Sequence, residues 1–136
     1  MRILSIDFGT VRIGTAISDE LGIVAAPLVV IPNGADAHER VAALARSNGA
    51  ERVVIGMPYA LNGAESDMTR MTREFAERLR PLLPCPLVEW DEAFSSRKAG
   101  ERMRSANVGR KRRRQKGETD TWAAAIILQE YLETLR

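Results

Sequence analysis

Short apolar runs at the start and in the middle of this chain alternate with longer amphipathic stretches. Runs rich in Val, Ile and Leu predict five strands, over residues 2–7, Arg12–Asp19, Gly22–Ile31, Arg52–Met57 and Leu87–Trp90. Short links that contain glycine join the first three of these strands. Such links favour antiparallel hairpins, because a parallel connection needs a longer crossover.

Apolar residues at helical spacing predict helices between and after the later strands. The predicted helices cover Asp36–Asn48, Ser66–Leu83, Ser95–Met103 and Thr119–Leu135. Their inward faces would carry Val41, Leu44 and Ala45, then Met68, Met71, Phe75, Leu79 and Leu82, and finally Ala124, Leu128, Tyr131 and Leu135. Three hairpin strands followed by alternating helix and strand predict an α/β fold. Its mixed five-stranded sheet would be flanked by helices, with parallel pairing in the second half.

The length and composition narrow the class of protein. A chain of 136 residues is most simply one domain, residues 1–136. The single cysteine, Cys85, excludes an intrachain disulfide and a cysteine-based zinc site. The N-terminus lacks the shape of a signal peptide, and no stretch approaches the roughly 20 apolar residues that cross a bilayer. We therefore expect a cytoplasmic protein without a membrane partner.

The positive charge is concentrated in one short segment of the chain. Six of the seven residues at positions 110–116 are basic, namely Arg110, Lys111, Arg112, Arg113, Arg114 and Lys116. Outside this basic segment, 14 Lys and Arg face 18 Asp and Glu, a net charge of −4. The segment falls in a predicted irregular loop over Ser105–Gly117. It could be a solvated loop or interaction tail, but an acidic body with one cationic arm favours nucleic acid bound through its phosphates.

Acidic residues stand at three places where elements end or begin. Asp7 ends the first apolar run, Asp91 and Glu92 follow the last strand, and Asp120 opens the last predicted helix. If folding gathers them, their mutual repulsion requires a hard cation, and oxygen ligands suit Mg²⁺ or Mn²⁺. Because neighbouring strand residues point to opposite faces, we favour Glu92 as the direct ligand, with Asp91 as a second ligand or partner. Asp7 would bridge two ions, because it emerges from the most central strand.

Each acid also has an ordinary structural interpretation. Asp7 and Gly9 could form a plain turn between hairpin strands, and Asp91 with Glu92 could be solvated loop charges. Asp120 in the first turn of a helix would be stabilised by the helix dipole without any metal. The case for a site therefore depends on the three places converging.

The chain has few of the residues that covalent catalysis uses. Its one histidine, His38, belongs to a polar helix start, where we expect a surface residue, and both tryptophans are expected to pack in the interior. Without a histidine-based triad, metal-activated water is the natural nucleophile for phosphodiester hydrolysis. Two other classes remain open: an ATP-binding protein, because Asp7-Phe8-Gly9-Thr10 is similar to a phosphate loop of actin-like ATPases, and a nucleic-acid-binding module without catalysis.

Several motifs, taken in order, resemble the YqgF family, which is also called RuvX. These are Ile6-Asp7-Phe8-Gly9-Thr10 with Arg12-Ile13-Gly14 and Ser18-Asp19, Val54-Ile55-Gly56-Met57-Pro58 with Gly63, Trp90-Asp91-Glu92, and Asp120 before Ala123-Ala124 and Ile127-Leu128-Gln129. The resemblance implies an RNase H-like fold similar to the RuvC resolvases. It also implies a metal-dependent nuclease with Asp7, Glu92 and Asp120 as catalytic acids.

The resemblance implies two kinds of substrate. One is the precursor of 16S rRNA, processed at its 5′ end, and the other is branched DNA such as a Holliday junction, whose symmetrical cutting would require a homodimer. The chain departs from the family pattern at Ala93, where the family often has an arginine directly after the acidic pair. This departure removes a phosphate contact or an ion pair that orients an acid.

Overall fold

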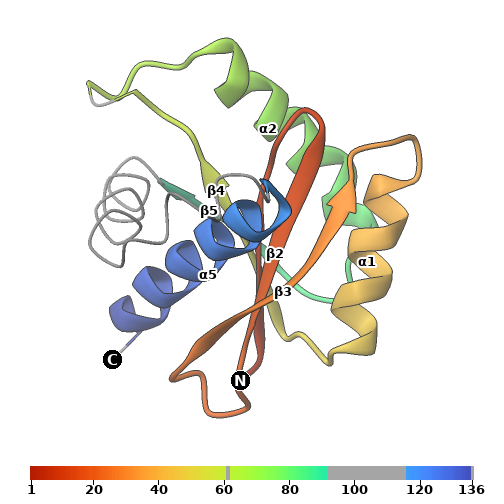
Figure 1. Ribbon diagram of the computed structural model, residues 1–136, viewed down its shortest axis with the longest axis vertical. Helices are drawn as coiled ribbons and strands as arrows, with labels where there is room; N and C mark the ends of the chain where they lie inside the picture. The colour runs from red at the N-terminus through yellow and green to blue at the C-terminus, as the bar shows by residue number, and fades with distance from the viewer. Residues whose placement is uncertain (61, 92–115, 136) are drawn as a thin grey trace.

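A computed structural model describes residues 1–60, 62–91 and 116–135, with the backbone alone for residues 116–119 (Figure 1). Within the described residues, one sheet contains β1 (Ile3–Asp7), β2 (Arg12–Ser18), β3 (Ala25–Pro32), β4 (Arg52–Met57) and β5 (Leu87–Asp91). The strand order is β3-β2-β1-β4-β5, which puts β1 in the centre. The first three strands pair antiparallel, whereas β1, β4 and β5 pair parallel. The predicted mixed sheet is confirmed.

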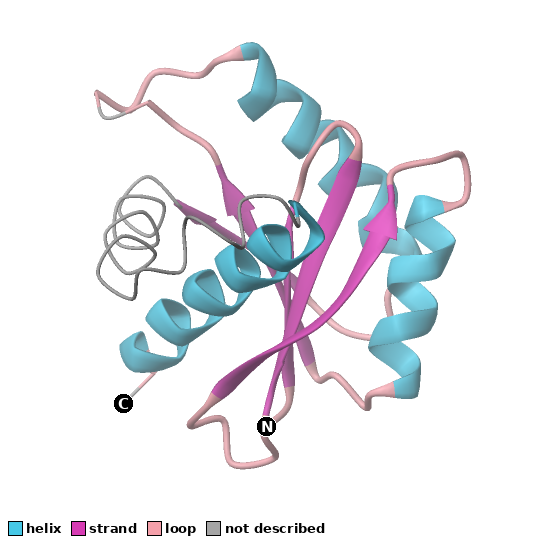
Figure 2. Ribbon diagram, in the orientation of Figure 1, coloured by secondary structure: helices cyan, strands magenta, loops and turns pink. Residues whose placement is uncertain are grey.

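Helices cover both faces of this sheet. They are α1 (Ala37–Ser47), α2 (Asp67–Leu79) with the 3₁₀ turn η1 (Arg80–Leu82), and α5 (Lys116–Thr134). Figure 2 shows α5 crossing one face of the strands, while α1 and α2 lie on the other side. Each side has its own buried apolar cluster. None of these helices is long and apolar enough to cross a membrane.

The side chains of β1 point alternately to the two helix-covered faces of the sheet. Leu4 and Ile6 are buried in the cluster under α1 and α2, whereas Ile3 belongs to the cluster under α5. Ser5 points to the α5 side as well, since its Oγ donates a hydrogen bond of 2.7 Å to the carbonyl oxygen of Ala124. Successive strand residues face opposite sides. Asp7 therefore lies on the α5 face of the sheet, at the end of the central strand.

The predicted inward face of α2 is confirmed at Phe75 and Leu79 and wrong at Met71. The helix ends at Leu79, followed by η1, and Met71 is exposed, while Thr69 and Thr72 are fully buried. The Oγ1 of Thr72 donates to the carbonyl oxygen of Met68 at 2.7 Å. A threonine whose hydroxyl bonds the preceding turn of the helix buries its methyl group like an apolar residue. Apolar spacing alone did not show this.

The predicted α5 is confirmed at its buried residues Ala124, Leu128 and Tyr131, and its start lies three residues earlier than predicted. The helix begins at Lys116, so Lys116 and Gly117 are helical rather than part of an irregular loop. The conformational cost of glycine applies to the interior of a helix, so a glycine in the first turn costs less. The helix ends at Thr134, which leaves Leu135 exposed, and Trp122 is 38% exposed rather than packed inside.

The third strand begins later than predicted, at Ala25 instead of Gly22. Asp19 accepts hydrogen bonds from the backbone N–H groups of Ile23 and Val24, at 2.7 and 3.1 Å. These hydrogen bonds lower the pKa of Asp19 below its ordinary value. Ile23 and Val24 are therefore part of a turn despite their strand composition.

Candidate active site

The carboxyl ends of three parallel strands lie at one edge of the sheet. Asp7 is the last residue of β1 and is half-buried, and Asp91 is the last residue of β5. Ligands of open α/β sheets bind outside the carboxyl ends of such strands. The edge formed by β1, β4 and β5, which we call the carboxyl edge, is thus the place to look for a site.

Helix α5 brings Asp120 to this edge by packing on a glycine. Gly14 in β2 pairs in register with Asp7. A Cβ atom added to Gly14 would lie 2.2 Å from the backbone oxygen of Asp120 and 3.0 Å from its Cβ. Asp7 and Asp120 therefore approach the same glycine, one from the neighbouring strand and one from the helix above the sheet.

The position of Asp120 within α5 excludes the interpretation that Asp120 is there only to stabilise the start of the helix. Because α5 begins at Lys116, Asp120 is its fifth residue and lies beyond the first turn. Stabilisation of a carboxylate by the helix dipole falls off within that turn. Helix capping therefore does not account for an aspartate at this position.

An arginine that the sequence analysis did not assign to the site holds Asp120. The Nε of Arg12 donates to the Oδ2 of Asp120 at 3.1 Å, and both side chains are partly exposed. The Arg12-Ile13-Gly14 segment stood out only as part of a family motif. This pair joins residues 108 positions apart. It is an acid-orienting ion pair of the kind that Ala93 cannot supply.

Asp91 points away from Asp7. Its register partner in β4 is Met57, which is buried in the cluster under α1 and α2, whereas Trp90 packs on the α5 side. Paired residues of a sheet project from the same face, so Asp91 lies on the face opposite to Asp7. This arrangement agrees with the preference for the neighbouring residue, Glu92, as the direct ligand.

Several predicted site residues lie outside the described part of the chain. They are Glu92 and the basic residues Arg110, Lys111, Arg112, Arg113 and Arg114, and for Lys116 the backbone alone is described. Among the described residues, no group of three or more His, Cys, Asp or Glu side chains could hold a metal ion. A third ligand beside Asp7 and Asp120 would have to come from elsewhere, and Glu92 is the candidate that the sequence offers.

The turn after Asp7 is fixed by a glycine and an asparagine. A Cβ on Gly9 would lie 2.4 Å from the carbonyl oxygen of Arg12, so only glycine fits there. The Nδ2 of Asn33, just beyond β3, donates to the carbonyl oxygen of Gly9 at 2.8 Å. The sequence analysis missed Asn33, because nothing near it in the sequence connects it to this turn.

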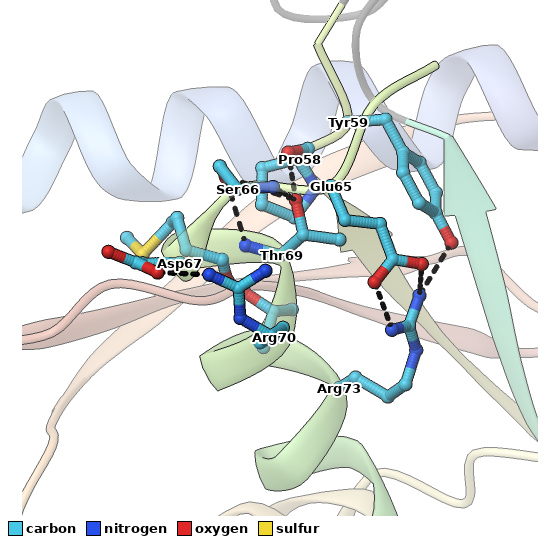
Figure 3. A network of polar contacts seen from close by, with 10 residues as sticks. Pro58, Tyr59, Glu65, Ser66, Asp67, Thr69, Arg70 and Arg73 are labelled. Atoms are coloured by element: carbon cyan, nitrogen blue, oxygen red, sulfur yellow. Dashed lines mark hydrogen bonds and ion pairs between the residues drawn. The ribbon is translucent and has the colours of Figure 1, made fainter.

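A polar network anchors the loop that leaves the carboxyl edge after β4. Figure 3 shows Arg73 of α2 pointing to Glu65 and Tyr59 of this loop. Two nitrogens of Arg73 donate to Glu65 at 2.8 and 2.9 Å, and Nη2 also donates to the hydroxyl oxygen of Tyr59 at 3.0 Å. The hydrogen bonds from Arg73 lower the pKa of Glu65.

The start of α2 closes the other side of the same loop. Ser66 caps the helix by accepting a hydrogen bond from the backbone N–H of Thr69 at 3.2 Å (Figure 3). The Oγ1 of Thr69 donates to the carbonyl oxygen of Pro58 at 2.7 Å. Both ends of the loop are thus tied to α2, which holds the loop next to the carboxyl edge.

Aromatic rings pack behind Asp7 on the other face of the sheet. The rings of Phe8 and Phe75 have centroids 5.1 Å apart, and His38 stacks on Phe75 at 4.4 Å. His38 is half-buried, so the expectation of a plain surface residue was wrong. Its Nε2 is buried and has no hydrogen-bond partner among the described residues. Burial lowers the pKa of His38 below 6.5.

Acidification should therefore destabilise the protein through His38. Because the pKa of His38 is lower in the folded state, the unfolded chain binds the proton more readily, and the free energy of unfolding decreases as the pH falls below 6.5. His38→Phe should keep the ring stack and show a smaller decrease. Urea unfolding of both proteins at about pH 7.5 and about pH 5.5 measures this difference. Equal decreases in the two proteins would contradict the assignment to His38.

Comparisons with known proteins identify the family of this chain. The model of the RuvX family, described as Holliday junction resolvase, matches residues 1–134. A relative from Syntrophus aciditrophicus (strain SB), named "Putative pre-16S rRNA nuclease", is 36% identical over 137 residues, which cover 99% of this chain and 90% of the relative. A relative of the same name from Bacillus thuringiensis (strain Al Hakam) is 38% identical over 138 residues, covering 98% and 99%.

Solved structures confirm the fold. Thermus thermophilus RuvC in complex with a Holliday junction substrate aligns with a TM-score of 0.61 at 15% identity, over 98% of this chain and 96% of RuvC. The fowlpox virus resolvase in complex with Holliday junction DNA also gives a TM-score of 0.61, at 12% identity and over 99% of each chain. The predicted RNase H-like, RuvC-like fold is thereby confirmed. Since the family model spans nearly all of the sequence and the relatives are more than a third identical over at least 90% of their length, the chain belongs to the RuvX family.

Proposed function

We propose that this protein is a metal-dependent nuclease that cleaves a structured RNA, in the processing of the 5′ end of 16S rRNA precursors. It belongs to a family of nucleases and resolvases, and relatives at 36% and 38% identity carry the name of a pre-16S rRNA nuclease. The observation that carries the proposal is the approach of Asp7 and Asp120 to Gly14 at the carboxyl edge. Strand pairing holds the backbone of Asp7 there, and the close packing of α5 on Gly14 holds that of Asp120.

The residues at this edge fit a divalent cation. Asp7 and Asp120 offer carboxylate oxygens, which are the donors that Mg²⁺ and Mn²⁺ prefer. The guanidinium of Arg12 contacts Asp120. Asp7, Asp120 and Glu92 would hold the ions, and the ions would supply an activated water and stabilise the departing oxygen.

The rest of the chemistry falls to the protein's own residues. The central strand fixes the backbone of Asp7, and the contact of α5 with Gly14 fixes that of Asp120. The basic residues Arg110, Lys111, Arg112, Arg113, Arg114 and Lys116 would bind phosphates of the substrate. Because these residues precede Asp120 closely in sequence, the phosphates would be gathered near the acids. Such contacts release counterions, so binding should weaken as salt increases.

One experiment tests the activity and the substrate together. Precursor 16S rRNA, duplex DNA and a four-way DNA junction are incubated with Mg²⁺ or Mn²⁺, with a chelator-treated sample and the Asp120→Asn variant as controls. We expect metal-dependent cleavage of the RNA precursor by the wild type and none by Asp120→Asn. Binding of the RNA without cleavage in either metal would contradict the nuclease proposal and favour a ribosome assembly factor.

A second candidate substrate is branched DNA. The family is described as Holliday junction resolvase, and the two structural relatives above were solved with Holliday junctions. In this case the four-way junction would be cut in preference to the RNA. Symmetrical cutting needs two active sites, so light scattering should then detect a homodimer bound to the junction.

A further inference from the structure

Arg12 places a positive charge at the site where we propose that cations bind. It is the first residue of β2 and lies two positions before Gly14, so both residues belong to the α5 face of the sheet. Its guanidinium contacts Asp120, one of the acids proposed to bind a cation. A cation and a guanidinium compete for the same carboxylate and repel each other. The presence of Arg12 therefore needs an explanation.

The contact has the features of an exchangeable ion pair. Only Nε of Arg12 and Oδ2 of Asp120 come together, at 3.1 Å, which is not the bidentate arrangement that makes arginine pairs strong. The side chains of Arg12 and Asp120 are 36% and 29% exposed, so water competes for both partners. A cation at the carboxyl edge could displace the guanidinium at little cost.

We propose that Arg12 is a positioning residue that acts as an exchangeable counter-charge for Asp120. Without a cation it holds the Asp120 carboxylate in place, and with a cation bound it releases the carboxylate and turns to a phosphate of the substrate. A guanidinium suits both partners, because its planar donors match carboxylate and phosphate oxygens. This inference rests on the proposed function, since it takes Asp120 as a ligand of the cation.

The exchange links binding of the cation to binding of the nucleic acid. Arg12 opposes the cation as long as Asp120 is its only anionic partner, and a substrate phosphate relieves this competition. Each of the two should therefore strengthen the binding of the other, because such coupling is reciprocal. Arg12 would lower the affinity for the free cation and raise the rate of cleavage when both are bound.

Titration with Mn²⁺ alone tests the first half of this inference. Electron paramagnetic resonance of free Mn²⁺ gives the dissociation constants of the wild type, Arg12→Gln, Arg12→Lys and Arg40→Gln. Arg40 is exposed on α1, so its variant controls for the loss of one positive charge. We expect Arg12→Gln to bind Mn²⁺ about tenfold more tightly than the wild type, as removal of a unit charge beside the carboxylate implies. Arg12→Lys and Arg40→Gln should stay close to the wild type.

Cleavage at saturating Mn²⁺ tests the second half. Although it binds the ion better, Arg12→Gln should cleave at least about tenfold more slowly and have a higher KM for the RNA, because a phosphate contact is lost. Arg12→Lys, which keeps the positive charge, should recover part of the rate. A merely structural role would instead weaken Mn²⁺ binding together with thermal stability, so melting temperatures of all variants are measured as well.

The outcomes separate this inference from the proposed function. If Asp7→Asn and Asp120→Asn lose Mn²⁺ binding while Arg12→Gln binds like the wild type or more weakly, the role of Arg12 is wrong and the metal site stands. If the wild type binds Mn²⁺ no better than Asp7→Asn, the metal site itself is wrong and the role of Arg12 falls with it. If Arg12→Gln does not fold, Arg12→Lys decides: a loss of Mn²⁺ affinity in that variant overturns the proposal.

Discussion

Replacing Asp7 by Asn should reduce cleavage about a thousandfold while nucleic acid still binds with nearly the wild-type affinity. The amide keeps the shape of the side chain at the end of β1 but removes the charge that would hold a cation. Losing the contribution of a metal ion to the transition state, on the order of 4 kcal/mol, corresponds to this factor. Binding depends mainly on basic residues, so it should persist or become slightly tighter as a negative charge is removed.

Single-turnover cleavage of the RNA precursor and fluorescence anisotropy at one fixed salt concentration measure the two effects separately. Asp36→Asn is the matched control, because Asp36 is exposed and its side chain makes no capping hydrogen bond at the start of α1. Asp36→Asn should cleave like the wild type. Normal turnover by a folded Asp7→Asn protein would refute the assignment of Asp7.

Replacing Gly14 by Ala should damage both stability and activity, although alanine is only one methyl group larger. The added Cβ would lie 2.2 Å from the backbone oxygen of Asp120 and 2.5 Å from its carbonyl carbon. Backbone cannot rotate out of the way as a flexible side chain can, so α5 has to move off the sheet. Overpacking of this kind costs about 1–3 kcal/mol of unfolding free energy. A shift of about 1 Å at a reacting group reduces the rate about a hundredfold.

Urea unfolding and the cleavage rate under conditions where the variant is fully folded measure these two losses. Gly34→Ala provides a matched control, because a Cβ at Gly34 would meet only a side-chain oxygen of Asp36 at 3.9 Å, which is an ordinary contact. Wild-type stability and cleavage in Gly14→Ala would show that the close approach of α5 to β2 is not required.

Strand positions could be predicted from the sequence because buried strands leave a strong apolar signal. β4 coincides with the predicted Arg52–Met57, and β1 and β2 differ from the prediction by one residue. Helix surfaces were harder to predict. The buried threonines of α2 satisfy their hydroxyls within the protein, and Gly117 sits in a first helical turn where it does little harm. The pattern of apolar residues shows neither these hydrogen bonds nor where in a helix a glycine falls.

The candidate site, too, could be predicted from the sequence only in part. That Asp7 would end the central strand followed from strand prediction and topology. The ion pair between Arg12 and Asp120 could not be predicted, since it depends on how α5 lies across β2 and joins residues 108 positions apart. The role of Gly14 likewise could not be predicted, because it depends on where the helix packs. The catalytic roles of Asp7, Glu92 and Asp120 remain predictions that the variants above test.

The packing of α5 across β1 and β2 has a consequence for the newly made chain. A fragment that stops before residue 116 could pair β1 with β2 and β4, but it would carry Asp7 without Asp120 or the hydrogen bond from Ser5 to Ala124. Contacts between such distant residues form late, after the intervening loop has closed. Translation would thus complete the candidate site only once α5 has left the exit tunnel.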